Sequence, residues 1–224
     1  MVKLFLYKAR DTNVVAILRR SKKRYEWQLI KWTIGEEKDN FEMGQWLIGK
    51  MIHPRYSSIS PDGNYFWYHY WEGGNYGEDA VFSKLPNFTA DYYGRWNTYF
   101  QDCGFTEDGK GVISLENQYN KRRYTSLELV LRKDVHPDSI LNSGYLGFRR
   151  SEYNNEFLNA ENKFETDDEV KSSTYYDYDE LYENHATFVD CKGRKITIKE
   201  GILYADEKVL LDTTEHKFEP VKPV

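Results

Sequence analysis

The sequence contains few cysteines and no grouping of metal ligands. Cys103 and Cys191 are the two cysteines among 224 residues, and neither belongs to a C-x-x-C pair. The five histidines form no pair at the i+2, i+3 or i+4 spacing, so the ligand spacing of a zinc site is missing. We therefore expect no metal and no other cofactor. For the cysteines we expect two buried thiols in a reducing cytoplasm, with one bridge between them as the alternative.

Long apolar runs are also missing. No stretch approaches the ~18 consecutive apolar residues that a membrane-spanning helix needs. The N-terminal segment MVKLFLYKARD has only a short apolar patch, without the longer apolar region and the small-residue cleavage site of a signal peptide. It predicts a first strand, and we expect a cytoplasmic protein without a membrane segment.

The common nucleotide-binding and hydrolase motifs are absent from the sequence. The glycines of EGGNYGED, at 72–79, do not follow the dinucleotide-binding pattern, and no P-loop lysine follows them. No G-x-S-x-G motif marks a nucleophilic serine. Cys103 paired with a histidine is a further candidate nucleophile, but the aromatic residues around it in FQDCGF favour a buried thiol. The net charge of -5 argues against extended nucleic-acid binding.

The chain is rich in aromatic side chains, which make up 17% of its residues and are bulky enough to build a core. Val14–Arg20 is a β-branched run and Trp27–Trp32 alternates with the period of a strand, which together predict a hairpin. We expect its basic tip to be solvated, with phosphate binding as the alternative. The basic residues concerned are Arg19, Arg20, Lys22, Lys23 and Arg24.

A Ser-Pro-Asp-Gly turn organises the middle of the chain. In Ser60–Asn64 the proline sets φ, the aspartate caps the turn and the glycine supplies the left-handed position. A very aromatic strand is predicted to follow at Tyr65–Trp71. The same logic recurs in FTEDGKGVIS and in FVDCKGRKITI. The three turn glycines, Gly63, Gly109 and Gly193, are 46 and 84 positions apart.

This recurrence sets the expected fold class. We expect an all-β, β-propeller-like repeat of short antiparallel sheets, with about five units of ~44 residues. A plain β-sandwich with Asp-Gly hairpins is the alternative, because such turns are common. Residues 1–224 are expected to form a single β-rich domain with an acidic, tyrosine-rich insertion at about 151–184.

The acidic insertion carries a concentrated negative charge. From Glu152 to Glu183 eleven acidic residues oppose two lysines, a net charge of -9, so the remainder of the chain carries +4. A solvated loop is one interpretation, and pieces of a calcium site are another, although the glycine and the terminal glutamate of such a site are missing. The functional interpretation is a surface for a basic partner, with these partner-binding residues: Asp167, Asp168, Tyr175, Tyr176, Asp177, Tyr178, Asp179 and Tyr182.

Two other functions remain open at this stage. A carboxylate pair at the mouth of a propeller would suit a glycosidase-like hydrolase. Its pool of candidates is Asp62, Asp79, Asp102 and Asp108. Exposed tryptophans such as Trp67 or Trp71 would suit a glycan-binding module, although core packing also explains them.

Three passages together resemble an uncharacterised family of bacterial cytoplasmic proteins. They are GQWLIGKMIHPRYSSISPDGNYFWY (44–68), AVFSKLPNFTADYYGRWNTYFQDCGFTEDGKG (80–111) and ATFVDCKGRKITIKEGILYADEKVLLDTTEHKFEPV (186–221). They cover about half the chain and match the G-Q-W-x-x-G, Ser-Pro-Asp-Gly and C-terminal Phe-Glu-Pro-Val segments of that family. The chain departs from the family at SKLPN (83–87), where the family has Ser-Arg-Pro-Pro-Tyr. The resemblance implies one cytoplasmic β-rich domain and brings no activity with it.

The function we expect from the sequence is therefore non-enzymatic. Tyrosines give large contact area at a low entropy cost, and acidic charge speeds the encounter with a cationic partner. The concrete form of this expectation is a bacterial immunity-type inhibitor that binds a basic toxin or another cationic protein through its acidic insertion.

Overall fold

The computed structural model describes residues 1–23, 25–54, 57–71, 78–96, 104–106, 111–114, 121–122, 128–131 and 188–218. Within these segments the regular structure is almost entirely β-strand, arranged in four sheets whose pairings are antiparallel except between β11 and β13. The predicted all-β class is therefore confirmed.

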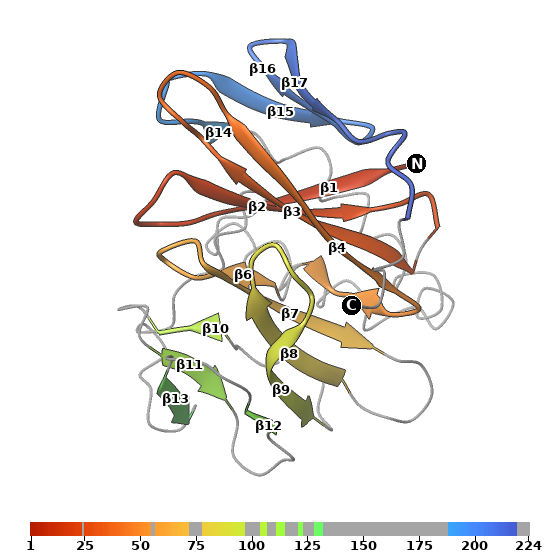
Figure 1. Cartoon of the computed structure of the whole chain (residues 1–224), viewed down its shortest axis with the longest axis vertical. Helices are drawn as coiled ribbons and strands as arrows, with labels where there is room; N and C mark the ends of the chain where they lie inside the picture. The colour runs from red at the N-terminus through yellow and green to blue at the C-terminus, as the bar shows by residue number, and fades with distance from the viewer. Residues whose placement is uncertain are drawn as a thin grey trace, which may run out of the picture.

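The four sheets follow the order of the chain, except that β12 of the second sheet lies between β11 and β13 of the third in the sequence (Figure 1). The first sheet joins, in this order, β1 (Lys3–Lys8), β2 (Val14–Arg20), β3 (Glu26–Thr33) and β4 (Asn40–Ile48). The second sheet has the order β12-β9-β8-β7-β5, with β6 also paired to β7. Its strands are β5 (Met51–Ile52), β6 (Ser58–Ile59), β7 (Tyr65–Trp71), β8 (Glu78–Lys84), β9 (Ala90–Trp96) and β12 (Lys121–Arg122).

Two smaller sheets complete the described fold. The third sheet consists of β10 (Gly104–Phe105), β11 (Gly111–Ser114) and β13 (Glu128–Leu131). The last sheet is a meander of β14 (Phe188–Val189), β15 (Lys195–Lys199), β16 (Ile202–Ala205) and β17 (Lys208–Asp212).

The first sheet is covered on both faces, so its first strands are buried almost continuously. Side chains of a strand alternate between the two faces of the sheet. Phe5 and Tyr7 of β1 pack toward the second sheet, whereas Leu4 and Leu6 pack toward the last sheet. The runs KLFLYK and VVAILRR are therefore apolar on both faces rather than on alternate positions.

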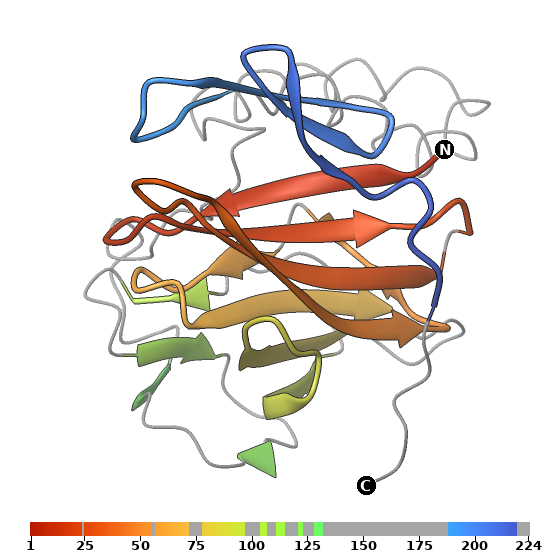
Figure 2. The same ribbon diagram turned by 45° about the horizontal axis from the view of Figure 1, so that its top comes forward.

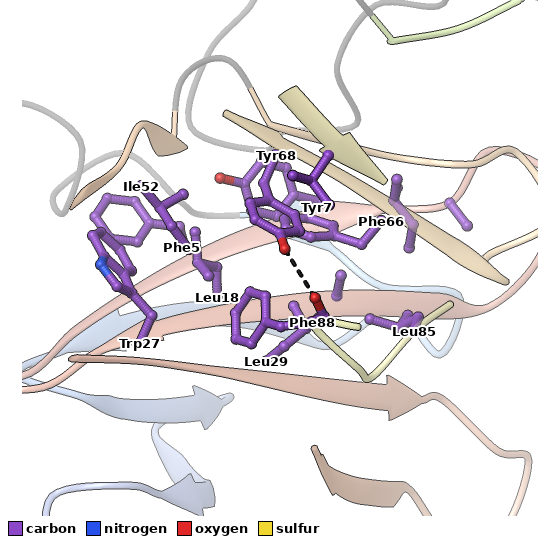
Figure 3. Packing of buried hydrophobic residues seen from close by; sticks show 14 residues of the cluster. Phe5, Tyr7, Leu18, Trp27, Leu29, Ile52, Phe66, Tyr68, Leu85 and Phe88 are labelled. Carbon is purple, nitrogen blue, oxygen red and sulfur yellow. Dashed lines mark hydrogen bonds between the residues drawn. The ribbon is translucent and has the colours of Figure 1, made fainter. Parts of the chain in front are cut away.

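The core between the first and second sheets is aromatic (Figure 3). Phe66 is fully buried there and its ring meets the edge of Tyr7 at 5.0 Å. The Tyr68 hydroxyl donates a hydrogen bond to the Phe88 carbonyl at 3.0 Å. The opposite face of β7 carries Trp67, which stacks on Phe82 at 6.3 Å. The strand is thus aromatic because both of its faces are covered, as its sequence suggests.

The sheets stack face to face in the order last, first, second, third (Figures 1 and 2). The contact between the second and third sheets includes Phe82 and the fully buried Phe105, whose rings are 6.5 Å apart. The contact between the first and last sheets includes Trp32 of β3 and Phe188 of β14, whose ring centroids are 6.2 Å apart. The first and last sheets in the sequence are therefore neighbours in space.

The recurring turns occupy equivalent places in the fold. Each follows a two-residue strand and precedes the next strand of the same sheet, namely β6 to β7, β10 to β11 and β14 to β15. Gly63 and Gly193 have φ values of +76° and +75°, so the left-handed glycine that the sequence predicts is confirmed at both. The Asp190 carboxylate accepts hydrogen bonds from the Lys192 and Arg194 amides, as expected of a turn cap.

Gly63 gives a test of how tightly these turns pack. A Cβ at this position would lie 2.6 Å from the Val14 Cβ, in addition to the strain of a positive φ. We expect Gly63→Ala to lower the free energy of unfolding by about 2 kcal/mol in urea titrations. Gly49 is the matched control, because its φ is +78° but nothing lies within 4 Å of its Cβ. Equal losses for Gly63→Ala and Gly49→Ala would show that the contact with Val14 contributes nothing.

The structure corrects two expectations for single residues. Arg19 does not belong to a solvated tip, because it is 1% exposed and faces the last sheet, where its guanidinium donates to the Thr213 carbonyl. That correction removes it from the phosphate-binding cluster. Cys191 is exposed rather than buried, because it lies in the tight turn between β14 and β15. Cys103 lies outside the described residues.

Candidate functional site

The acidic insertion is the strongest candidate for function, and it lies outside the described residues. This includes all eight predicted partner-binding residues, at 167–182. The described chain reaches Leu131 at the end of β13 in the third sheet and resumes at Phe188, the start of β14 in the last sheet. The insertion therefore belongs to the connection between these two sheets.

The chain is fastened where this connection rejoins the fold. Directly after β14, Asp190 accepts a hydrogen bond from the Arg194 Nε at 2.8 Å. The same guanidinium lies 2.8 Å from an oxygen of Asp39, in the loop between β3 and β4. Lys192 approaches the other oxygen of Asp39 at 3.4 Å. These four residues form an ion-pair cluster that joins the first hairpin of the last sheet to the first sheet.

Both carboxylates of the cluster are shielded from water, with side-chain exposures of 7% for Asp39 and 0% for Asp190. Burial raises the pKa of Asp190, but hydrogen bonds from the Arg194 side chain and from the Arg194 and Lys192 amides lower it by more. The net pKa of Asp190 is below its usual range, so this carboxylate is ionised at neutral pH. Shielded and hydrogen-bonded ion pairs have a more defined geometry than exposed ones, so the cluster holds the turn after β14 against the β3–β4 loop.

The carboxylates proposed for catalysis are only partly within the described structure. Asp62 caps its turn, since its Oδ1 accepts hydrogen bonds from the Ser60 hydroxyl at 2.6 Å and from the Asn64 amide at 3.0 Å. Burial raises its pKa, but these hydrogen bonds outweigh burial and hold the pKa of Asp62 below its ordinary value. Asp79 lies in β8 with its side chain outside the description, and Asp102 and Asp108 lie outside the described residues.

The residue that sequence reasoning missed beside Asp62 is Asp11. Its backbone amide donates to the Pro61 carbonyl at 2.9 Å, and Thr12 donates its hydroxyl to the Asp62 carbonyl at 3.2 Å. The turn between β1 and β2 therefore lies against the turn between β6 and β7. A hydrogen bond from Arg10 lowers the pKa of Asp11, so two ionised aspartates belong to adjacent turns. The polar run between two apolar strands, RDTN at 10–13, was the available signal.

The structure excludes one of the proposed glycan-binding residues. Trp67 is fully buried, with its indole between Phe82 and the imidazole of His69. Stacking on a sugar requires an exposed aromatic face, so Trp67 is a core residue and the glycan-binding expectation was wrong for it. Trp71 ends β7, and its side chain lies outside the description.

The described segments contain neither a candidate metal site nor a helix that could span a membrane. No group of three or more His, Cys, Asp and Glu side chains in those segments is placed to hold a metal ion. No helix in the same part of the chain has the length and apolar character needed to span a bilayer.

Comparison with known proteins gives no independent identification. No protein-family model matches the chain, and neither the curated proteins nor the solved structures contain a match. The functional argument therefore depends on the residues themselves.

Proposed function

We propose that this chain is a non-enzymatic, cytoplasmic protein-interaction module. In its concrete form it is a bacterial immunity-type inhibitor that binds a basic toxin or another cationic protein. The acidic, tyrosine-rich insertion supplies the contact surface, and the stacked β-sheets serve as the scaffold that carries it. No catalytic step is part of the proposal.

The observation that carries the proposal is the separation of charge along the chain. The insertion has a net charge of -9, while the remainder of the chain carries +4. A concentrated negative surface attracts a cationic protein over about one Debye length and raises the association rate. The ion-pair cluster at Asp190 and Arg194 supports the proposal, because it holds the turn that follows the insertion in the sequence against the first sheet.

We further propose that the scaffold is a ring of about five propeller-like units. The repeated turns support this, since each connects a two-residue strand to the next strand of the same sheet. The packing of the last sheet on the first also supports it, because a ring requires the two ends of the chain to meet. In such a ring the insertion would belong to the unit between the third and last sheets.

Neutralising the insertion should abolish partner capture. We expect the variant D167N/D168N/D177N/D179N to lose most of the basic protein that the unaltered chain retains in pull-downs from its native host. Each removed charge weakens the long-range attraction, and capture by the unaltered chain should itself fall between low and moderate salt. The captured protein is identified by mass spectrometry and its affinity is measured on purified components.

The matched control changes net charge by the same amount elsewhere. Glu36, Glu37, Glu207 and Glu215 are exposed, lie in described turns and belong to the sequence outside residues 151–184. The variant E36Q/E37Q/E207Q/E215Q should capture the partner as the unaltered chain does. If the two variants behave alike, net charge rather than the insertion governs binding, and the proposal is wrong.

A further inference from the structure

The last described residues of the chain, Thr213–Phe218, cross the first sheet and are referred to here as the C-terminal strap. They follow β17 of the last sheet and contact β2, β3 and β4 of the first sheet (Figure 2). Thr213 is fully buried and donates its hydroxyl to the Gly201 carbonyl at 2.6 Å. The strap thus ties the two ends of the chain together.

A buried arginine holds the strap in place. Arg19 donates to the Thr213 carbonyl from Nε at 3.1 Å and from Nη2 at 2.9 Å, and to the His216 carbonyl at 3.1 Å. Its guanidinium also lies 5.0 Å from the centre of the Trp46 ring. Charge-assisted hydrogen bonds to carbonyls, combined with a cation–π contact, make this a specific clamp. The clamp presents its positive charge directly to the strap.

His216 is the titratable residue of the strap. Its Nδ1 lies 3.2 Å from the Gln28 Oε1 of β3, and its own carbonyl accepts from Arg19. The charged groups around it are Arg19 on β2, Glu26 at the start of β3, Asp212 at the end of β17, and Glu215 and Lys217 within the strap. Gln28 and Trp46, which also face this region, are neutral.

The strap partly covers an apolar strip on β4. The register pairs Met43 with Ile30, Trp46 with Gln28 and Ile48 with Glu26, so these three β4 side chains share one face of the sheet. Met43 and Ile48 are 47% and 43% exposed. Phe218 of the strap packs edge-on against Trp46 at 6.1 Å. Removing the strap would therefore join Trp46 to the exposed strip.

We propose that the C-terminal strap is an acid-released latch, in which protonation of His216 beside Arg19 detaches residues 213–218 and uncovers Trp46 between Met43 and Ile48. Two cations in a partly buried site repel each other, and Asp212 offsets this repulsion only in part. The exposed apolar strip of β4 is then extended by Trp46, which Phe218 of the docked strap contacts at neutral pH.

The direction of the pH dependence follows from the surroundings of His216. Burial first, and then the Arg19 charge, lower the pKa of His216, while Asp212 raises it. A released strap has a histidine with the ordinary pKa of about 6.5. Docking of the strap is therefore fully favourable above that pH and weakens as the pH falls below it.

Hydrogen exchange of the strap amides tests the latch. The amides of Thr213, Thr214 and His216 donate hydrogen bonds within the docked strap, to the Gly201 carbonyl, the Asp212 carboxylate and the Thr213 carbonyl. After correction for intrinsic exchange rates, we expect their protection to fall by at least about threefold from pH 7.5 to pH 5. Amides of β2 and β3 serve as the internal control and should stay protected at both values.

Two variants separate the latch from general loosening. His216→Gln cannot be protonated, so its strap should keep the same protection at pH 5 and pH 7.5. Arg19→Lys loses the forked hydrogen bonds, so its strap should exchange faster at both values yet retain a pH response through His216. A strap that is equally protected at both pH values in the unaltered chain would overturn the proposal. So would the same pH response in His216→Gln.

Discussion

Phe66→Ala is expected to lower the free energy of unfolding by about 3–5 kcal/mol, measured by urea titration at pH 7.5. Phe66 is fully buried between the first and second sheets, with its ring against Tyr7 at 5.0 Å and against Tyr68 at 6.2 Å. The substitution removes the buried contacts of the phenyl ring and leaves a cavity that the flanking strands can close only in part. Domains of ordinary stability have about 5–15 kcal/mol in total, so this one change removes a large share.

Phe66→Leu is the companion variant, and it remains measurable if the alanine variant fails to fold. A leucine keeps most of the buried volume, so we expect a loss of about 1–2 kcal/mol. Losses below about 1 kcal/mol for the alanine variant would mean that the two sheets do not pack through Phe66. That result would contradict the stacked arrangement of the first and second sheets.

Acid is expected to destabilise the fold through His69. Burial, together with the nearby His53, lowers the pKa of His69 to about 3. In the unfolded chain the pKa is about 6.5, so between these values the unfolded state binds a proton that the folded state excludes. The contribution of neutral His69 to the free energy of unfolding is therefore fully present above pH 6.5. It decreases as the pH falls, by about 3 kcal/mol between pH 7.5 and pH 4.

His69→Phe isolates this contribution. His69 packs against Trp67 at 5.7 Å in an edge-on arrangement, which a phenylalanine ring can also make. The unfolding free energy of the variant, followed from pH 7.5 to pH 4, should have a clearly shallower slope than that of the unaltered chain. Depressed carboxylates such as Asp62 and Asp190 act mainly below pH 5 and remain in both proteins. Identical slopes would show that His69 is already protonated or accessible in the folded state.

The sequence predicts the local features of the fold well, namely its turns and the bounds of its strands. The turn at Ser60–Asn64 has the aspartate cap and the positive-φ glycine that its residues demand. The strands at Val14–Arg20 and Tyr65–Trp71 have the bounds expected from β-branched and aromatic runs. These features depend on neighbours within a few positions, so no knowledge of distant contacts is needed.

Distant contacts explain the expectations that were wrong. Arg19 follows the apolar run at 14–18 near the end of β2 and precedes two lysines, so its sequence context predicts exposure. Its actual partner is the Thr213 carbonyl, 194 positions away, which buries the guanidinium. Trp67 was open to a surface role for the same reason, because the Phe82 and Phe105 rings beyond it come from later strands.

In the candidate site, too, features set by neighbouring residues are predictable and features set by distant contacts are not. The acidic composition of the insertion is evident from the sequence, but the ion pair that follows it in the sequence joins Arg194 to Asp39, far earlier in the chain. Asp11 was missed as a neighbour of Asp62 because the two turns meet only through the packing of the first and second sheets. The sequence therefore predicts which types of residue are present, but only the folded structure shows which of them lie next to one another.

Site-specific photo-crosslinking within the insertion tests the central claim most directly. A photoreactive phenylalanine analogue would replace Tyr178 in one variant and Tyr25, an exposed residue of the β2–β3 hairpin, in another. If the insertion binds a cationic protein, the Tyr178 variant forms a covalent adduct with a basic partner at low salt, and the Tyr25 variant does not. An adduct from Tyr25 alone, or none from Tyr178 under conditions where the partner is bound, would contradict the account.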